Sequence, residues 1–141
     1  MKKVSILLIV AMTMSLAFVS CGGGSSNTPA DMEMKLMSYA QKGDYKKMVD
    51  YWLDNSIIDE SQGMTKAQMK SMSSMLIEKM KEPLEAQGGV KSVKLVKEEI
   101  SEDGMTAKVH LMITYGDGTE EEKTSPYKKV DGEWKMDGTM K

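Results

Sequence analysis

Residues 106–115 read TAKVHLMITY, and this stretch decides the class of fold. Its apolar side chains fall on every second residue, at Ala107, Val109, Leu111, Ile113 and Tyr115. Alternation with a period of two is typical of a β-strand that buries one face and leaves the other to polar side chains. The apolar face of such a strand needs a covering layer. The stretch therefore predicts a sheet that is packed on one side only.

Three further strands flank this one in the sequence. Val93 and Leu95 alternate with lysines before it, while a polar strand (119–130) and a short last strand (133–137) follow it. Turns rich in glycine and aspartate separate the strands, at residues 102–104, 116–118 and 131–132. Pro126 lacks a backbone donor, which indicates a bulge or an edge in the polar strand. Four strands joined by three turns predict an antiparallel meander.

Helical signals precede the strands. Thr28 is a good N-cap and Pro29 a good first residue for a helix that ends near residue 42, where Gly43 follows. Its predicted buried side includes Met34 and Met37, and also Ala30, Leu36, Ala40 and Gln41.

Two more helices are expected. Asp44 caps the second, whose apolar positions are Tyr45, Met48, Val49, Trp52 and Leu53. After a loop (55–63), the sequence from Thr65 to Gln68 forms a capping box for the third. The buried side of the third helix is predicted to be Met69, Met72, Leu76 and Met80, and Pro83 ends or kinks it. The expected fold is α+β, with three N-terminal helices packed on one face of a four-stranded antiparallel meander.

The N-terminus has the features of a signal peptide. Residues 1–27 read MKKVSILLIVAMTMSLAFVSCGGGSSN: two lysines, an apolar run, the small residue Ser20 and the only cysteine, Cys21. The apolar run is shorter than the roughly 20 residues that span a bilayer. We therefore expect a signal peptide at 1–20, a tether at 21–28 and one folded domain at 29–138. An uncleaved membrane helix and a secreted protein with a free thiol are the alternatives.

Composition excludes several kinds of site. Removal of residues 1–20 leaves 17 lysines and 21 acids, a net charge of −4, which disfavours binding to nucleic acid. All the basic residues are lysine, so no bidentate arginine site for phosphate or carboxylate can form. A single cysteine excludes a disulfide framework and a zinc–thiolate site.

The segments QKGDYKKMVDYW (41–52), GGVKSVKLV (88–96), YGDGTEEE (115–122) and VDGEWKM (130–136) resemble those of one family. It comprises small bacterial lipoproteins with a nuclear-transport-factor-like (NTF2-like, or cystatin-like) domain of unknown function, of the family-4878 type. The resemblance implies a cone-shaped domain and acylation of Cys21, with palmitate among the chains, although Phe18 departs from the usual leucine. Gly22, where inner-membrane retention would need aspartate, favours an outer-membrane anchor facing the periplasm.

No catalytic residue, metal site or cofactor is predicted. The lone histidine, His110, falls on the polar face of its strand, so alternation points it away from the covered side. The triplet at residues 120–122 has no calcium-loop spacing. The 16 methionines are core filler or, alternatively, soft ligands for copper(I). Residues predicted for a pocket or the core are Tyr45, Met48, Trp52, Leu76, Val109, Leu111, Ile113, Tyr115 and Trp134.

The functional hypothesis is a non-enzymatic binding or interaction domain, held to the lipid bilayer by Cys21. Its partner would be a small apolar ligand or another envelope protein, and no nucleic acid. One alternative is an isomerase-like or hydratase-like enzyme of the same superfamily, with a pocket acid from Asp54 or Asp59. The other is a methionine-rich periplasmic copper(I) protein.

Overall fold

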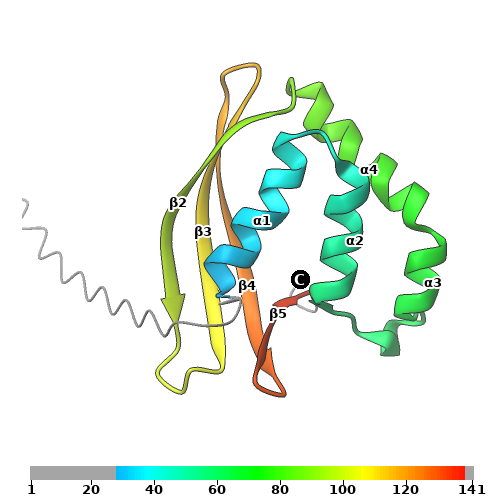
Figure 1. The fold of residues 1–141 in the computed structure, drawn as a ribbon, viewed down its shortest axis with the longest axis vertical. Coiled ribbons are helices and arrows are strands. Elements are labelled where there is room, and N and C mark those ends of the chain that lie inside the picture. The colour runs from blue at the N-terminus through cyan, green and yellow to red at the C-terminus, as the bar shows by residue number, and fades with distance from the viewer. Residues whose placement is uncertain (1–27, 139–141) are drawn as a thin grey trace, which may run out of the picture.

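The computed structural model describes residues 28–138, in which helices precede strands and one sheet is covered by helices (Figure 1). The elements are α1 (Pro29–Gln41), α2 (Tyr45–Asn55), β1 (Ser56–Ile57), the 3₁₀ turn η1 (Glu60–Gln62), α3 (Lys66–Ser71), α4 (Ser73–Ala86), β2 (Val90–Ile100), β3 (Thr106–Tyr115), β4 (Glu120–Val130) and β5 (Glu133–Asp137). The predicted α+β class is confirmed. The anchor and most of the tether predicted from the sequence lie outside these residues.

The sheet has five strands in the order β1-β5-β4-β3-β2. The predicted antiparallel meander is present in β2 to β5, but β1 adds a parallel pairing with β5, in which Ser56 is opposite Met136. The prediction of four antiparallel strands was therefore wrong in detail. A two-residue strand that pairs across 80 positions leaves no periodic signal in the sequence, and 55–63 was expected to be a loop.

Local sequence explains where the first two helices begin. The Thr28 side chain accepts a hydrogen bond from the backbone N–H of Asp31, and Asp44 accepts one from the backbone N–H of Lys47. Gly43, between the helices, adopts φ of +71°, which a residue with a side chain rarely tolerates. Figure 1 shows α1 lying across the sheet and α2 beside it.

The third predicted helix is two helices. It begins at the predicted capping box of Thr65 and Gln68, but breaks at Met72, whose φ and ψ of −101° and 17° are not helical. The chain then continues as α4 through Pro83 to Ala86, so of the two predicted alternatives, an end or a kink at Pro83, the end is wrong. After the break, Ile77, Met80 and Leu84 pack against the core, and Leu76, predicted for it, does not.

The core lies between α1, α2 and the inner face of the sheet. The five alternating apolar residues of β3 are buried, as the strand period predicted. They pack with buried side chains from the two helices and the neighbouring strands: Met32, Leu36, Met37, Ala40, Tyr45, Met48, Val90, Tyr127 and Met136. The space between α1, α2 and this part of the sheet is therefore occupied by side chains.

One close backbone contact fixes the end of α4 to the β3–β4 turn. The N–H of Gly116 donates to the carbonyl of Gly89, and that of Asp117 donates to the carbonyl of Gln87, each over 2.9 Å. A Cβ atom on Gly116 would lie 2.2 Å from the carbonyl oxygen of Gly88. Only glycine fits at this position.

Among the helices of residues 28–138, none combines the length and the apolarity needed to cross a membrane.

Candidate functional site

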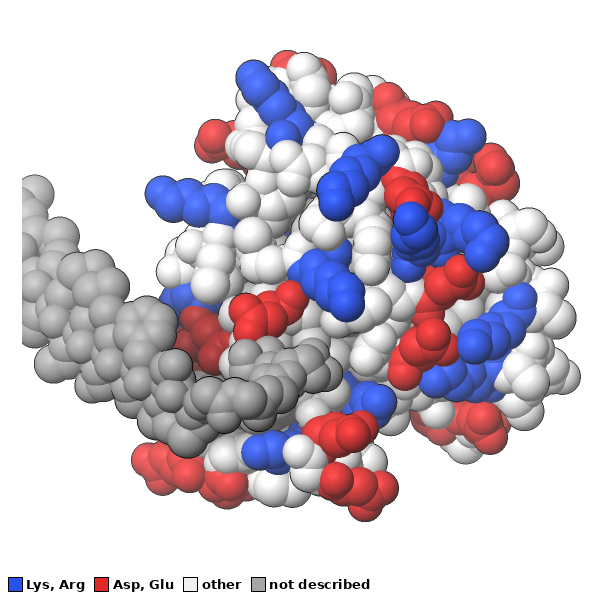
Figure 2. Space-filling view, viewed as in Figure 1, with Lys and Arg blue, Asp and Glu red and all other residues white. Residues whose placement is uncertain are grey.

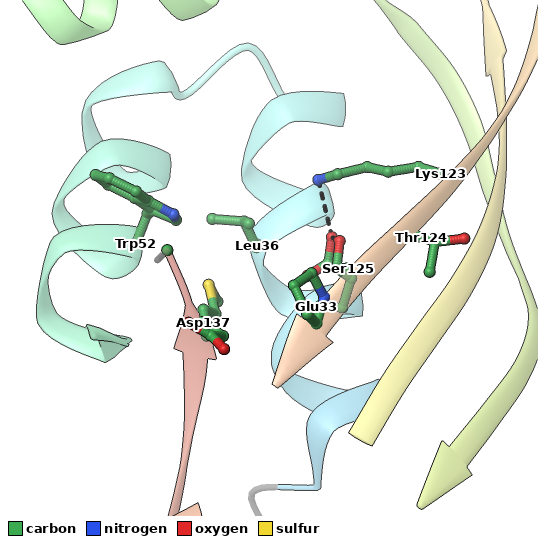
Figure 3. Close-up of a pocket in the computed structure, with 10 residues that line it drawn as sticks. Glu33, Leu36, Trp52, Lys123, Thr124, Ser125 and Asp137 are labelled. Carbon is green, nitrogen blue, oxygen red and sulfur yellow. Dashed lines mark hydrogen bonds and ion pairs between the residues drawn. The ribbon is translucent and has the colours of Figure 1, made fainter. Parts of the chain in front are cut away.

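A pocket of about 220 Å³ opens where β5 separates from β4 (Figure 3). Its walls come from α1, α2, β4 and β5: Glu33, Leu36, Trp52, Lys123, Thr124, Ser125, Pro126, Met136, Asp137 and Gly138. The pairing of β4 with β5 ends at Tyr127 and Met136.

Pro126 explains this separation. The backbone N–H of Lys129 donates to the carbonyl of Met105, just before β3. Backbone hydrogen-bonding groups alternate in direction along a strand, so those of residues 127 and 125 also point toward β3. The backbone groups of residues 128 and 126 then point toward β5. Pro126 is where the next hydrogen bond to β5 would form, and proline has no N–H to donate. The predicted bulge is absent, because the pairing of β4 with β3 is regular at Pro126, and β4 is not an edge of the sheet. At Pro126 the strand lacks a partner only on its β5 side, and the pocket opens there.

Glu33 is the buried charge of this site. It lies on α1 with 1% of its surface exposed. Its Oε1 accepts hydrogen bonds from Lys123 Nζ (2.9 Å) and Ser125 Oγ (2.8 Å), and its Oε2 accepts one from the Tyr127 hydroxyl (2.5 Å). The dashed line in Figure 3 marks the contact with Lys123. One carboxylate on α1 thus binds three residues of β4.

These contacts keep Glu33 ionised. Burial by itself raises the pKa of a carboxyl group. Here the positive charge of Lys123 and the three donated hydrogen bonds outweigh burial and lower the pKa of Glu33 below its ordinary value. Burial and the charge of Glu33 raise the pKa of Tyr127, so this phenol keeps its proton and remains a donor. The cluster can therefore join helix to sheet, but it is poorly suited to taking up a proton.

The rest of the pocket is mainly apolar. Leu36, Trp52 and Met136 form its walls, and Figure 3 shows Trp52 across the opening from β4. Trp52 was predicted for a pocket or the core. Of the other residues so predicted, the structure buries Tyr45, Met48, Val109, Leu111, Ile113 and Tyr115, and it leaves Trp134 partly exposed against the core.

His110 lies on the opposite, outer face of the sheet. Its Nε2 is 2.8 Å from Glu99 Oε2, and its Nδ1 is 2.9 Å from the Thr124 hydroxyl. This carboxylate–imidazole–hydroxyl row runs across β2, β3 and β4. Thr124 is a lining residue of the pocket, but His110 and Glu99 are not, and both edges of β3 are occupied by neighbouring strands. Acyl transfer needs free backbone N–H groups to stabilise the oxyanion of its tetrahedral intermediate. Beside His110 these groups form the hydrogen bonds of the sheet.

The other candidate acids lie elsewhere. Asp54 forms an ion pair with Lys70 over 3.0 Å, and Asp59 caps η1; neither borders the pocket. Glu121 accepts a hydrogen bond from the Tyr115 hydroxyl over 2.6 Å. Within residues 28–138, no three histidine, cysteine, aspartate or glutamate side chains come together as metal ligands would.

Comparison with known proteins supports the fold. No curated protein matches the chain. A putative NTF2-like transpeptidase from Campylobacter jejuni has a similar structure, with a TM-score of 0.54 and 18% identity over 78% of this chain and 97% of that one. A SEC-C motif-containing protein from Rhodopseudomonas palustris gives a TM-score of 0.48 and 13% identity, over 78% and 75% of the two chains.

The family model for a domain of unknown function, DUF4878, matches residues 19–137. That range includes every helix and strand described above. The chain is therefore a member of the DUF4878 family and has the NTF2-like fold.

Proposed function

We propose that the chain is a lipid-anchored domain of the bacterial cell envelope that binds a ligand in the pocket beside Glu33 and is not an enzyme. In this proposal the signal peptide is removed after Ser20, and Cys21 carries the acyl chains. The anchor lies in the outer membrane, and the domain faces the periplasm. Support for the anchor comes from the basic, apolar and small residues before Cys21.

The observation that carries the binding proposal is that the negative charge of Glu33 is compensated by Lys123 and by donated hydrogen bonds. Proton transfer in an enzyme needs a group whose pKa lies near the working pH. Glu33 is a buried carboxylate at a pocket, as such a group would be, but Lys123, Ser125 and Tyr127 lower its pKa and occupy its oxygens. Glu33 therefore serves to hold α1 against β4 and does not transfer protons.

The name of the Campylobacter jejuni protein raises transpeptidation as an enzymatic alternative. Such a reaction needs an activated nucleophile. Ser125 has a hydroxyl group at this pocket, and this group donates a hydrogen bond to Glu33 Oε1. A carboxylate with a lowered pKa is a weak base for that proton, so this arrangement supports binding over acyl transfer.

The walls favour an apolar ligand. Leu36, Trp52 and Met136 present aliphatic, aromatic and thioether groups, and the charges of Glu33 and Lys123 offset each other at the base. About 220 Å³ is less than the roughly 300–1,000 Å³ of sites for drug-sized molecules. We therefore propose a small apolar ligand, with an apolar side chain of an envelope protein as the second candidate.

Titration with the apolar fluorophore N-phenyl-1-naphthylamine tests the pocket. The mature chain with Cys21→Ser avoids acyl chains that would themselves bind the probe. We expect saturable binding that Trp52→Ala abolishes and Trp134→Ala preserves, because Trp134 is a partly exposed tryptophan that does not line the pocket. Equal binding by the two variants would contradict the proposal.

Metabolic labelling with radioactive palmitate tests the anchor. The wild-type protein should be labelled and recovered with outer membranes, whereas Cys21→Ser should be unlabelled. Label retained in the Cys21→Ser protein would contradict the proposed attachment site.

A further inference from the structure

Exposed large apolar side chains of residues 28–138 occur in two separate groups. One group lies on β2, in the β2–β3 turn and at the end of β4: Leu95, Val96, Ile100, Met105 and Val130. The other lies in and before the α3–α4 pair: Met64, Met72 and Met75. Figure 1 shows the β2–β3 and β4–β5 turns together at the lower end of the sheet, with α3 and α4 on the far side of α2.

We propose that the lower end of the sheet, which we call the membrane end and define by Ile100, Met105 and Val130, rests on the bilayer that holds the lipid anchor. This inference depends on the proposed acylation of Cys21. It adds an orientation to that proposal: the domain lies with its two hairpin turns against the lipid surface, and α3 and α4 face away from it.

Backbone contacts place the start of the folded chain near this end. The N–H of Ala30, in the first turn of α1, donates to Glu98 Oε2 over 2.7 Å. Glu98 is two residues from Ile100, whose side chain is 51% exposed. Met105 is 47% exposed, and its carbonyl accepts from the N–H of Lys129, the residue before Val130. The membrane end is thus continuous with the point at which the chain enters the domain.

The length of the tether then restricts what can reach the bilayer. Six residues separate Cys21 from Thr28, and the seven steps between the two, fully extended, span at most about 25 Å. From Glu98, which contacts the start of α1, the eight residue steps along β2 to Val90 span roughly 26 Å. The opposite end of the sheet therefore lies at the limit of the fully extended tether, whereas the membrane end is well within its reach.

Charge does not oppose this contact. The turns carry the acids Glu102, Asp103 and Asp131, and the adjacent strand ends carry two further acids and four lysines: Glu99, Glu133, Lys108, Lys128, Lys129 and Lys135. Figure 2 shows both signs at the lower end of the molecule. Because the two signs nearly cancel, contact comes from apolar side chains that enter the interface while the charged tips stay at headgroup level.

A single fluorescent label tests the orientation. The acylated full chain is reconstituted in vesicles of phosphatidylethanolamine and phosphatidylglycerol and labelled with nitrobenzoxadiazole at Met105→Cys. Met75→Cys is the matched control, an exposed methionine on α4. Cys21 is the only natural cysteine, so acylation leaves each variant with one reactive thiol. Far-UV circular dichroism and a second site, Ile100→Cys, guard against a local folding defect.

We expect the label at residue 105 to shift to the blue, to brighten and to be quenched by nitroxide lipids, while the label at residue 75 behaves as in water. Identical aqueous behaviour at both sites, in protein that floats with the vesicles, would overturn the orientation and leave the anchor intact. Protein that does not float and whose Cys21 reacts with the label would overturn the anchor, and the orientation with it. A blue shift that depends on protein concentration in detergent would assign the surface to a second copy instead.

Discussion

Replacement of Lys123 by methionine should expose how strongly the buried carboxylate depends on its partner. The change keeps most of the aliphatic stem and removes the ammonium group 2.9 Å from Glu33 Oε1. Ser125 and Tyr127 still donate to Glu33, so the variant isolates the charge pair from the rest of the cluster.

The expected cost lies between two limits. Removing one partner of a fully buried ion pair costs about 3–5 kcal/mol, and removing one of an exposed pair about 0–1 kcal/mol. Glu33 is buried, but the side chain of Lys123 is 40% exposed, so water screens the ammonium group. We therefore expect a loss of about 1–3 kcal/mol in the free energy of unfolding.

The dependence on pH has a definite sign. In the wild type the pKa of Glu33 is lowered on folding, so its stabilising contribution is present above the ordinary value of 4.5 and is lost as the pH falls through the folded pKa. Without Lys123, its positive charge no longer offsets the effect of burial, so the pKa of Glu33 rises. The stability difference between wild type and variant should therefore be largest at neutral pH and shrink in acid.

Urea unfolding followed by circular dichroism measures both effects. Lys46→Met is the matched control, because Lys46 pairs with Asp50 over 2.8 Å with both side chains well exposed. That control should unfold like the wild type. A Lys123→Met protein as stable as this control, or a cost that does not change with pH, would refute the reasoning.

Three further predictions concern individual contacts. Tyr127→Phe removes a donor to the buried Glu33 and should cost about 1.5–3 kcal/mol by urea unfolding; an unchanged midpoint would contradict the contact. Burial and the hydrogen bond to a nearby carboxylate raise the pKa of Tyr115 to about 12, so the tyrosinate absorbance that Tyr115→Phe removes should develop late, and the associated stability should be lost as the pH rises from 10 to about 12. Because the pKa of Tyr127 is raised as well, the test is the difference between wild type and Tyr115→Phe; a difference that titrates at the ordinary value of 10 would refute this assignment. Gly116→Ala places a Cβ atom against the carbonyl of Gly88 and should lower the free energy of unfolding by about 1–3 kcal/mol, seen as a lower thermal midpoint. Wild-type stability would show that the turn can move to accommodate the methyl group.

Regular patterns in the sequence predicted much of the fold. The alternation of β3 predicted its buried face, and Thr28, Asp44 and Thr65 predicted three helix starts, because strand period and capping are local properties. The pairing of β1 with β5 is not local, and neither is the break at Met72. These features depend on which surfaces meet after folding.

The site was harder to predict, because its main residue looks like a surface charge. Glu33 lies between Met32 and Met34, yet it occupies the stripe of Ala30, Met37 and Ala40 on α1. That spacing of three and four residues was the available signal. Its three partners lie 90, 92 and 94 positions further along the chain, on a strand whose sequence is polar. Only the fold brings an acidic helix position opposite three donors on β4.

In the proposed function, the carboxylate of Glu33 joins α1 to β4 and takes no part in proton transfer. A carbon-13 NMR titration of the Glu33 side-chain carboxyl group measures whether it can do so. We expect a midpoint below the ordinary value of 4.5, because Lys123 and three hydrogen bonds stabilise the ionised form. A midpoint raised toward neutral pH would show a carboxylate able to accept a proton and would rule out this purely structural role.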